Sequence, residues 1–222
     1  LLVAIVVYYT FTNSKNIQYG QDGRLLPIFY LLLFLIFIIA NKVFSFWGIL
    51  LFEQFAFYFA WLCSVLFLLG KRYTLHILFP LLFFIFAIPF WEFFVPFFVD
   101  LTTVAVTFLL RFSDLTVFIH QNFIETPFGT IEVAKGCSGI RYFEIGLALA
   151  VLSVQEENFS WRVKLVVVLF GALLGIITNW IRVLSLVYIG YWSEMTSSLM
   201  SDHEYYGFLL FFAVISGLIF FV

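Results

Sequence analysis

Residues 165–190, LVVVLFGALLGIITNWIRVLSLVYIG, form an apolar run with one charged side chain, Arg182. A helix of this length rises roughly 39 Å at 1.5 Å per residue, enough to cross the ~30 Å hydrocarbon core of a bilayer. Polar groups in such a segment cost several kcal/mol unless they are paired or hydrated. Asn179 lies three residues before Arg182, so the two share one helix face. The run therefore predicts a transmembrane helix with a functional polar face.

The rest of the sequence repeats this pattern. Of its 222 residues, 64% are hydrophobic and 11% are charged, whereas a soluble domain has roughly half and one-quarter. We expect an all-α fold, a single domain over 1–222 that forms a polytopic transmembrane helical bundle of about seven to eight spans. The sequence begins without Met inside an apolar run, so we expect a truncated N-terminus. The expected spans are roughly 1–12, 25–40, 43–69, 73–89, 93–110, 138–154, 165–190 and 206–222.

Two segments depart from simple helical crossings. Residues 111–136 combine Thr, Val and Ile with Gly and Pro, which predicts a short extended or hairpin element outside the bilayer. Residues 73–110 contain AIPFWEFFVPFF, whose two prolines and glutamate make a poor straight crossing. If every span crosses once, the distribution of Lys and Arg places the loop before Cys137 in the cytoplasm. If half of 73–110 is re-entrant or interfacial, that loop lies outside, and the polar link 155–164 favours this second arrangement.

Cys137 lies where the sixth expected span begins. Arg141 follows four residues later, so both would share one face of a helix that starts near Gly136. Ser138 and Gly139 permit a tight entry turn. A thiol at a helix N-terminus beside a guanidinium has a lowered pKa, because both features favour the thiolate. The alternative is a capping turn with an arginine that reaches the lipid head groups.

Connectivity brings two further polar groups to the same membrane face. Arg182 lies about 25 Å along its helix from Lys164, near the end at which Cys137 enters. The link that follows carries His203 just before the last span and returns to that face. Taken singly, Arg182 could reach the head groups and His203 could be a solvated loop residue. Taken together, a thiol, a guanidinium and an imidazole converge at one side of the bilayer.

This set of side chains has the chemistry of acyl transfer. A thiolate attacks a carbonyl, an imidazole moves protons and a fixed cation stabilises the oxyanion. One thiol with one or two histidines does not make a structural zinc site, so we expect no metal and no cofactor. Cys63 falls mid-span, where it is expected to be a small core residue and not a disulfide partner of Cys137. The scattered basic residues indicate no nucleic-acid partner.

Three motifs, in order, resemble the exosortase/archaeosortase family of membrane cysteine transpeptidases. The family pattern Cys-Ser-Gly-x-Arg is matched by GTIEVAKGCSGIR at 129–141, and Asn-x-x-Arg by NWIR at 179–182. The family's late histidine is matched by HEYYGF at 203–208, and the similarity covers about 75–215 as the catalytic core. A histidine at this third position is typical of the bacterial branch. Lys135 and the glycine after it depart from the acidic or small pair that usually precedes the cysteine.

The resemblance implies a function. Family members are multi-pass inner-membrane cysteine peptidases with an outward-facing active site, which cleave C-terminal sorting signals of exported proteins through a thioacyl intermediate. It implies Cys137 as the nucleophile, Arg182 as the transition-state stabiliser and His203 as the general acid/base. Supporting roles fall to Arg141, Asn179, Ser138 and Gly139. The implied partners are secreted proteins with a PEP-CTERM-like sorting tail, membrane lipid and an acyl acceptor of undefined chemistry.

The alternative is a non-catalytic membrane scaffold or transporter subunit. In that case Arg182 and His203 would line a pathway across the bilayer, and the thiol would have no chemical role. Other membrane proteases fit less well, because the sequence lacks the Asp pairs of presenilin-like enzymes and the Glu-Glu-x-x-x-Arg of prenyl-protein endopeptidases. It also lacks a rhomboid-like Gly-x-Ser-x-Gly element.

Overall fold

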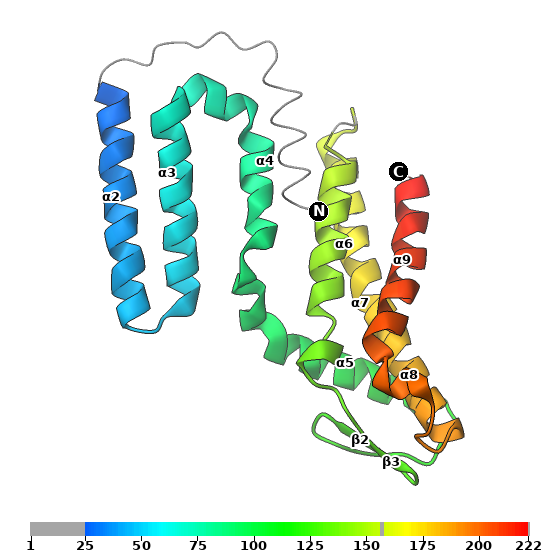
Figure 1. The fold of residues 1–222 in the computed structure, drawn as a ribbon. Helices are drawn as coiled ribbons and strands as arrows, with labels where there is room; N and C mark the ends of the chain where they lie inside the picture. Colours follow the sequence, from blue (N-terminus) through cyan, green and yellow to red (C-terminus); the bar gives the residue numbers. More distant parts are fainter. Residues whose placement is uncertain (1–24, 156–157, 222) are drawn as a thin grey trace. The chain divides into compact units, whose positions relative to one another are not determined.

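The computed structural model describes residues 25–155 and 158–221. These residues form helices and one three-stranded sheet (Figure 1). The chain divides into two compact units, Leu1–Phe90 and Trp91–Val222. Every predicted site residue belongs to the second unit.

The first unit contains a hairpin of two long helices, α2 (Leu25–Phe46) and α3 (Leu50–His76). We expected the first of these helices to end near residue 40, but it continues for six residues more, to Phe46. Asn41 does not end the helix because its Nδ2 donates a hydrogen bond across the hairpin to the Glu53 carbonyl at 2.9 Å. The turn comes instead at Gly48, whose φ of 69° suits glycine best.

The chain then bends repeatedly. Gly70 interrupts α3 with φ 77° and ψ 162°, where the sequence predicted a link between two spans. A short helix α4 (Leu78–Phe83) gives way to 3-10 turns η1 (Phe84–Ala87) and η2 (Pro89–Phe94). The segment 73–110 is therefore not one continuous helix, and a re-entrant or interfacial course for half of it stays a prediction.

In the second unit, α5 (Val95–Leu110) leads into the sheet. Its strands are β1 (Phe118–His120), β2 (Phe123–Thr126) and β3 (Gly129–Glu132), which pair antiparallel in the order β1-β2-β3. The extended element predicted before the cysteine is thus present. The sheet buries one face against helical side chains in a cluster formed by Val106, Leu110, Ile124, Val133, Cys137, Val183 and Val187. The 3-10 turn η3 (Lys135–Cys137) follows directly.

Two helices of this unit approach each other very closely, α6 (Ile140–Ser153) and α7 (Trp161–Trp192). A Cβ atom built on Gly146 would lie 2.5 Å from the Gly171 carbonyl oxygen. One built on Gly175 would lie 2.3 Å from the Tyr142 carbonyl oxygen. Small residues four apart on α7 thus let two backbones touch, as in many membrane helix pairs. The unit ends with α8 (Ser198–Ser201) and α9 (His203–Phe221).

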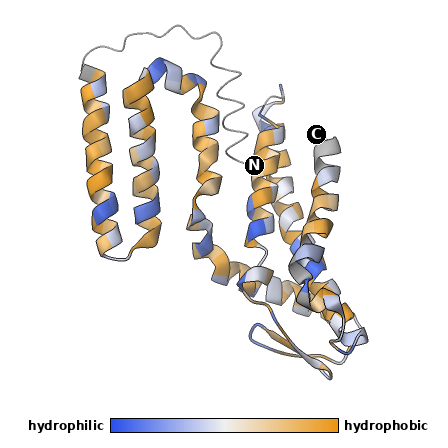
Figure 2. Ribbon diagram, in the orientation of Figure 1, coloured by the Kyte–Doolittle hydropathy of each residue, from blue (hydrophilic) through white to orange (hydrophobic). Residues whose placement is uncertain are grey.

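The described helices carry the apolar surface of a membrane protein. Four of them are long and apolar enough to cross a bilayer, namely Leu26–Phe46, Leu50–His76, Pro89–Leu110 and Trp161–Trp192. Figure 2 shows hydrophobic residues along much of their length and hydrophilic residues mainly near helix ends and turns. Two more apolar helices, Leu78–Ala87 and Tyr205–Gly217, are shorter. The span expected at 1–12 lies outside the described residues, so the total of seven to eight spans stays a prediction.

Replacing Gly175 by Ala should separate α6 from α7. The added methyl group would meet backbone atoms of Tyr142 and Phe143, which cannot rotate away as a side chain would. Overpacking of this kind costs about 1–3 kcal/mol. The midpoint of thermal unfolding in detergent should fall accordingly. Gly217→Ala is the matched control, because a Cβ atom at that position would have nothing within 4 Å; equal midpoints for the two variants would contradict the packing described.

Candidate active site

Arg182 of α7 is buried inside the protein, with 1% of its surface exposed. Its Nη1 donates to the Gly136 carbonyl at 3.1 Å and to Asn179 Oδ1 at 3.4 Å. Its guanidinium carbon lies 5.5 Å from the centre of the Tyr142 ring, within the range of a cation–π contact. The predicted shared face of Asn179 and Arg182 is confirmed, and the Arg182 side chain is enclosed by protein atoms.

Nothing in the described part of the chain neutralises this buried charge. The ion pair that the structure shows there joins Lys135 to Glu92 at 2.9 Å and does not include Arg182. Arg182 Nε also has no hydrogen-bond acceptor among the described residues. A buried cation of this kind has lost much of its hydration and is suited to an arriving negative charge.

Asn179 is fully buried and holds the turn that carries the cysteine. Its Nδ2 donates to the Cys137 carbonyl at 2.8 Å and to Thr102 Oγ1 at 3.3 Å. Thr102 Oγ1 in turn donates to the Ser138 carbonyl at 2.9 Å. With the bond from Arg182, three successive carbonyl oxygens, from Gly136 to Ser138, are each bound by a buried side chain from another helix. Thr102 was not predicted from the sequence, where its only signal is a hydroxyl in an apolar helix.

Gly139 is required at its position for two independent reasons. Its φ of 88° is left-handed, which a residue with a Cβ atom adopts only with strain. A Cβ atom there would also lie 2.6 Å from Asn179 Nδ2. Ser138 closes the same turn, because its Oγ donates to the Lys135 carbonyl at 2.8 Å. These contacts place Gly139 and Ser138 in the turn that carries Cys137, and their supporting roles stay a prediction.

The prediction of one helix face for Cys137 and Arg141 is wrong. The left-handed residue Gly139 separates η3 from α6, which begins only at Ile140. Cys137 therefore ends a 3-10 turn and is buried with 7% exposure, whereas Arg141 is exposed. The Cys137 side chain packs in the core cluster against the sheet, whereas Arg141 lines a small cavity together with Arg182. Cys63 is a buried thiol in α3 and is not its disulfide partner.

The last helix, α9, packs directly over Arg182. A Cβ atom on Gly207 would lie 2.5 Å from Arg182 Nε and 2.2 Å from the Tyr142 hydroxyl oxygen. Tyr206 and Ser185 add a hydroxyl–hydroxyl hydrogen bond of 3.0 Å between α9 and α7. His203 is the first residue of α9, four residues before Gly207. Its side chain lies outside the described part, so its approach to Cys137 stays a prediction.

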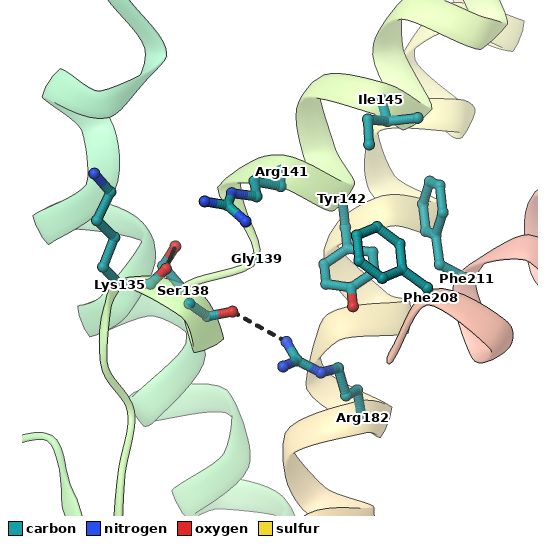
Figure 3. A pocket seen from close by; sticks show the side chains of 10 residues that line it. Lys135, Ser138, Gly139, Arg141, Tyr142, Ile145, Arg182, Phe208 and Phe211 are labelled. Carbon is teal, nitrogen blue, oxygen red and sulfur yellow. Dashed lines mark hydrogen bonds between the residues drawn. The ribbon is translucent and has the colours of Figure 1, made fainter. Parts of the chain in front are cut away.

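A small cavity of about 30 Å³ lies between the turn and Arg182, and Cys137 is not among the residues that line it. In Figure 3, Arg182 extends from α7 towards the turn, and the rings of Tyr142, Phe208 and Phe211 gather above it. The dashed line there is the hydrogen bond to the Gly136 carbonyl. The cavity walls combine cationic and apolar groups, contributed by Lys135, Gly136, Ser138, Gly139, Arg141, Tyr142, Ile145, Arg182, Phe208 and Phe211.

The fold and this site define an integral membrane protein with a thiol-bearing turn held against a buried arginine. The chain belongs to the transmembrane exosortase family, because residues 1–221 match the model of that family. The resemblance seen in the three sequence motifs is thereby confirmed over essentially the whole chain. Comparison with curated proteins and with solved structures gave no significant match.

Replacing Asn179 by Ala should loosen the turn and expose the thiol. The change leaves the Cys137 carbonyl without its buried donor, and such a loss costs about 1–3 kcal/mol. In a Cys63→Ser background, maleimide should then label Cys137 roughly tenfold faster than in the parent. Asn122→Ala is the control, since its side-chain hydrogen bond to Glu132 is exposed. Equal labelling rates in both variants would show that Asn179 does not hold the turn.

Proposed function

We propose that this protein is a membrane-embedded cysteine peptidase/transpeptidase that cleaves C-terminal sorting signals of exported proteins. Its membership of the transmembrane exosortase family supports a membrane transpeptidase. The observation that carries the assignment of the site is Arg182, a buried cation bonded to the turn of Cys137 and lacking a described acidic partner. This is the arrangement that an oxyanion formed beside the thiol would require.

The first half-reaction forms a thioester. The thiolate of Cys137 attacks the carbonyl carbon of the scissile peptide bond, and the electron pair of the C=O bond moves to oxygen. Arg182 stabilises that oxyanion, because a fixed cation in a water-poor site interacts with it strongly. His203 gives a proton to the leaving amine as the C–N bond breaks. The tail departs, and the exported protein remains attached to the sulfur.

The second half-reaction releases the protein. An acceptor nucleophile, or water, attacks the thioester carbonyl, and His203 takes its proton. Arg182 stabilises the second oxyanion, the C–S bond breaks and the thiolate of Cys137 is restored. Asn179, Ser138 and Gly139 hold the turn throughout. Asn179 donates to the Cys137 carbonyl, Ser138 Oγ donates to the Lys135 carbonyl, and Gly139 supplies the left-handed step.

We propose that the substrate tail contains an extended signature, an apolar helix and a basic end, as in PEP-CTERM-like proteins. The apolar helix would lie in the bilayer beside the enzyme, which places the cleavage site at the membrane interface. Arg141 is exposed at the rim of the cavity, where it would contact the signature. The enzyme would be a multi-pass protein of a bacterial inner membrane, with about seven to eight spans, its active site facing outward and lipid as its solvent.

Replacing Cys137 by Ala should abolish processing. Cells that carry the variant should accumulate exported proteins with intact C-terminal tails, because no other thiol can form the acyl-enzyme. Mass spectrometry of membrane fractions, searched for tail peptides, measures this directly. Cys63→Ala is the matched control, since that thiol is buried in α3. Normal tail removal in the Cys137 variant would leave a scaffold or transporter subunit as the better description.

Replacing Arg182 by Lys should lower the processing rate by about 10²-fold or more, the usual effect of removing an oxyanion donor. Lysine keeps the charge but loses the planar set of N–H groups that binds both the turn and the oxyanion. The rate is measured by pulse–chase of a tail-bearing protein. Arg162→Lys, on the same helix beside Trp161, is the control and should process normally. Comparable rates in the two variants would exclude a transition-state role for Arg182.

A further inference from the structure

We infer that the open edge of β3 binds the extended signature of the substrate by adding it to the sheet as a fourth strand. This inference rests on the proposed function and goes beyond it, because it names the surface that recognises the signature and the conformation in which it is bound. Three features carry it: the hydrogen-bond register of the sheet, the exposure of its edge and the course of the chain between β3 and Cys137.

The register shows which backbone groups of β3 are available. Val133 donates to the Asn122 carbonyl at 2.8 Å, and these two residues face each other across the ladder. In an antiparallel pair, hydrogen-bonded and non-hydrogen-bonded positions alternate. Ile131 therefore bonds to β2, whereas the N–H and C=O groups of Thr130 and Glu132 point away from it. No described strand pairs with this outer edge, since the sheet order ends at β3.

The edge is also accessible. Thr130 and Glu132 are exposed, whereas Ile131 packs on the core cluster and Val133 is fully buried. The strand is thus fixed to the protein through alternate side chains while its outer backbone groups remain open. An unpaired strand edge of this kind is a template for another extended chain, and several peptide-binding domains recognise their ligands in this way.

The path of the chain from β3 to Cys137 indicates that the substrate signature is what binds at the β3 edge. After β3, Ala134 keeps an extended conformation with φ −81° and ψ −179°, and η3 then carries Cys137. The edge therefore runs without interruption into the turn that presents the thiol. A peptide paired with Thr130 and Glu132 would be fixed in register, and register determines which carbonyl reaches the nucleophile. Backbone pairing also leaves sequence preference to the side chains on either face of the added strand.

The other edge of the sheet provides an internal comparison. β2 lies between β1 and β3, so β1 is about 9–10 Å from β3 at the usual spacing of strands. No turn with a thiol follows β1; the chain returns at once into β2 through Gln121 and Asn122. Only the β3 edge combines open backbone groups with a direct connection to Cys137 within the described sheet.

The first test scans the substrate and does not depend on the folding of an enzyme variant. The probe is an exported reporter fused to the tail of a host protein whose processing stops in Cys137→Ala cells. Each residue of the signature is replaced in turn by Pro and, separately, by Ala. Because Pro lacks the N–H group, strand addition predicts that cleavage falls at alternate positions, on the order of fivefold or more for each lost bond. At the positions whose N–H groups pair with the edge, alanine should have a clearly smaller effect than proline, because alanine keeps the N–H group.

The second test changes the enzyme at the edge. Thr130→Pro removes an outward N–H group but leaves the ladder to β2 intact, and Thr130→Ala keeps that N–H group as the matched control. Reporter cleavage should be about fivefold or more slower in the first variant than in the second, because both lose the threonine side chain and only the first loses the N–H group. Glu132→Pro and Glu132→Ala repeat the comparison at the other outward position. The amount of each variant in the membrane is measured by immunoblot to normalise the rates.

The outcomes separate this inference from the proposed function. If Cys137→Ala stops reporter cleavage but the Pro scan shows no alternation, strand addition is overturned and the peptidase stands. Equal rates for the Pro and Ala variants of Thr130 and Glu132 would overturn it in the same way. If Cys137→Ala leaves cleavage intact, the proposed function fails and the substrate site inferred from it fails too.

Discussion

The burial of the Arg182 guanidinium against the turn that carries Cys137 is the constraint on which the second unit depends. Arg182, Asn179 and Thr102 bind three consecutive carbonyl oxygens of that turn from two different helices. A polar backbone turn at this depth would be costly if its acceptors were left without donors. The same side chains that satisfy the turn therefore fix where the thiol is presented.

Glycine makes this burial possible, because α6 and α9 must approach α7 more closely than side chains normally allow. Gly175 lets α6 touch α7, and Gly207 lets α9 lie over the guanidinium. Gly139 adds the left-handed step that ends the 3-10 turn before α6 begins. Each glycine lacks the side chain that would otherwise hold it apart from the neighbouring helix or turn. The site is thus formed by close backbone packing as much as by polar contacts.

Part of this arrangement could be predicted from the sequence because it follows from periodicity. The spacing of Asn179 and Arg182 placed them on one face, and the change from apolar runs to Thr, Val and Ile predicted an extended or hairpin element, though not its three strands. The start of α6 could not be predicted in this way. A glycine such as Gly139 can lie in the first turn of a helix, or it can adopt a left-handed conformation that ends the preceding turn before the helix begins. Thr102 was missed for a related reason: a hydrogen bond between distant helices leaves no periodic signal.

Under the proposed function, the resting site also accounts for how a buried cation would serve catalysis. In the described structure Arg182 interacts with carbonyl dipoles and an aromatic face, which are weaker partners for it than a full negative charge would be. An oxyanion that forms beside Cys137 would supply that charge only as the transition state is approached. In the proposed reaction the interaction would therefore strengthen towards the transition state, which is the condition for lowering a barrier instead of merely binding substrate. A carboxylate paired with Arg182 in the resting state would remove this difference, because the cation would already be neutralised.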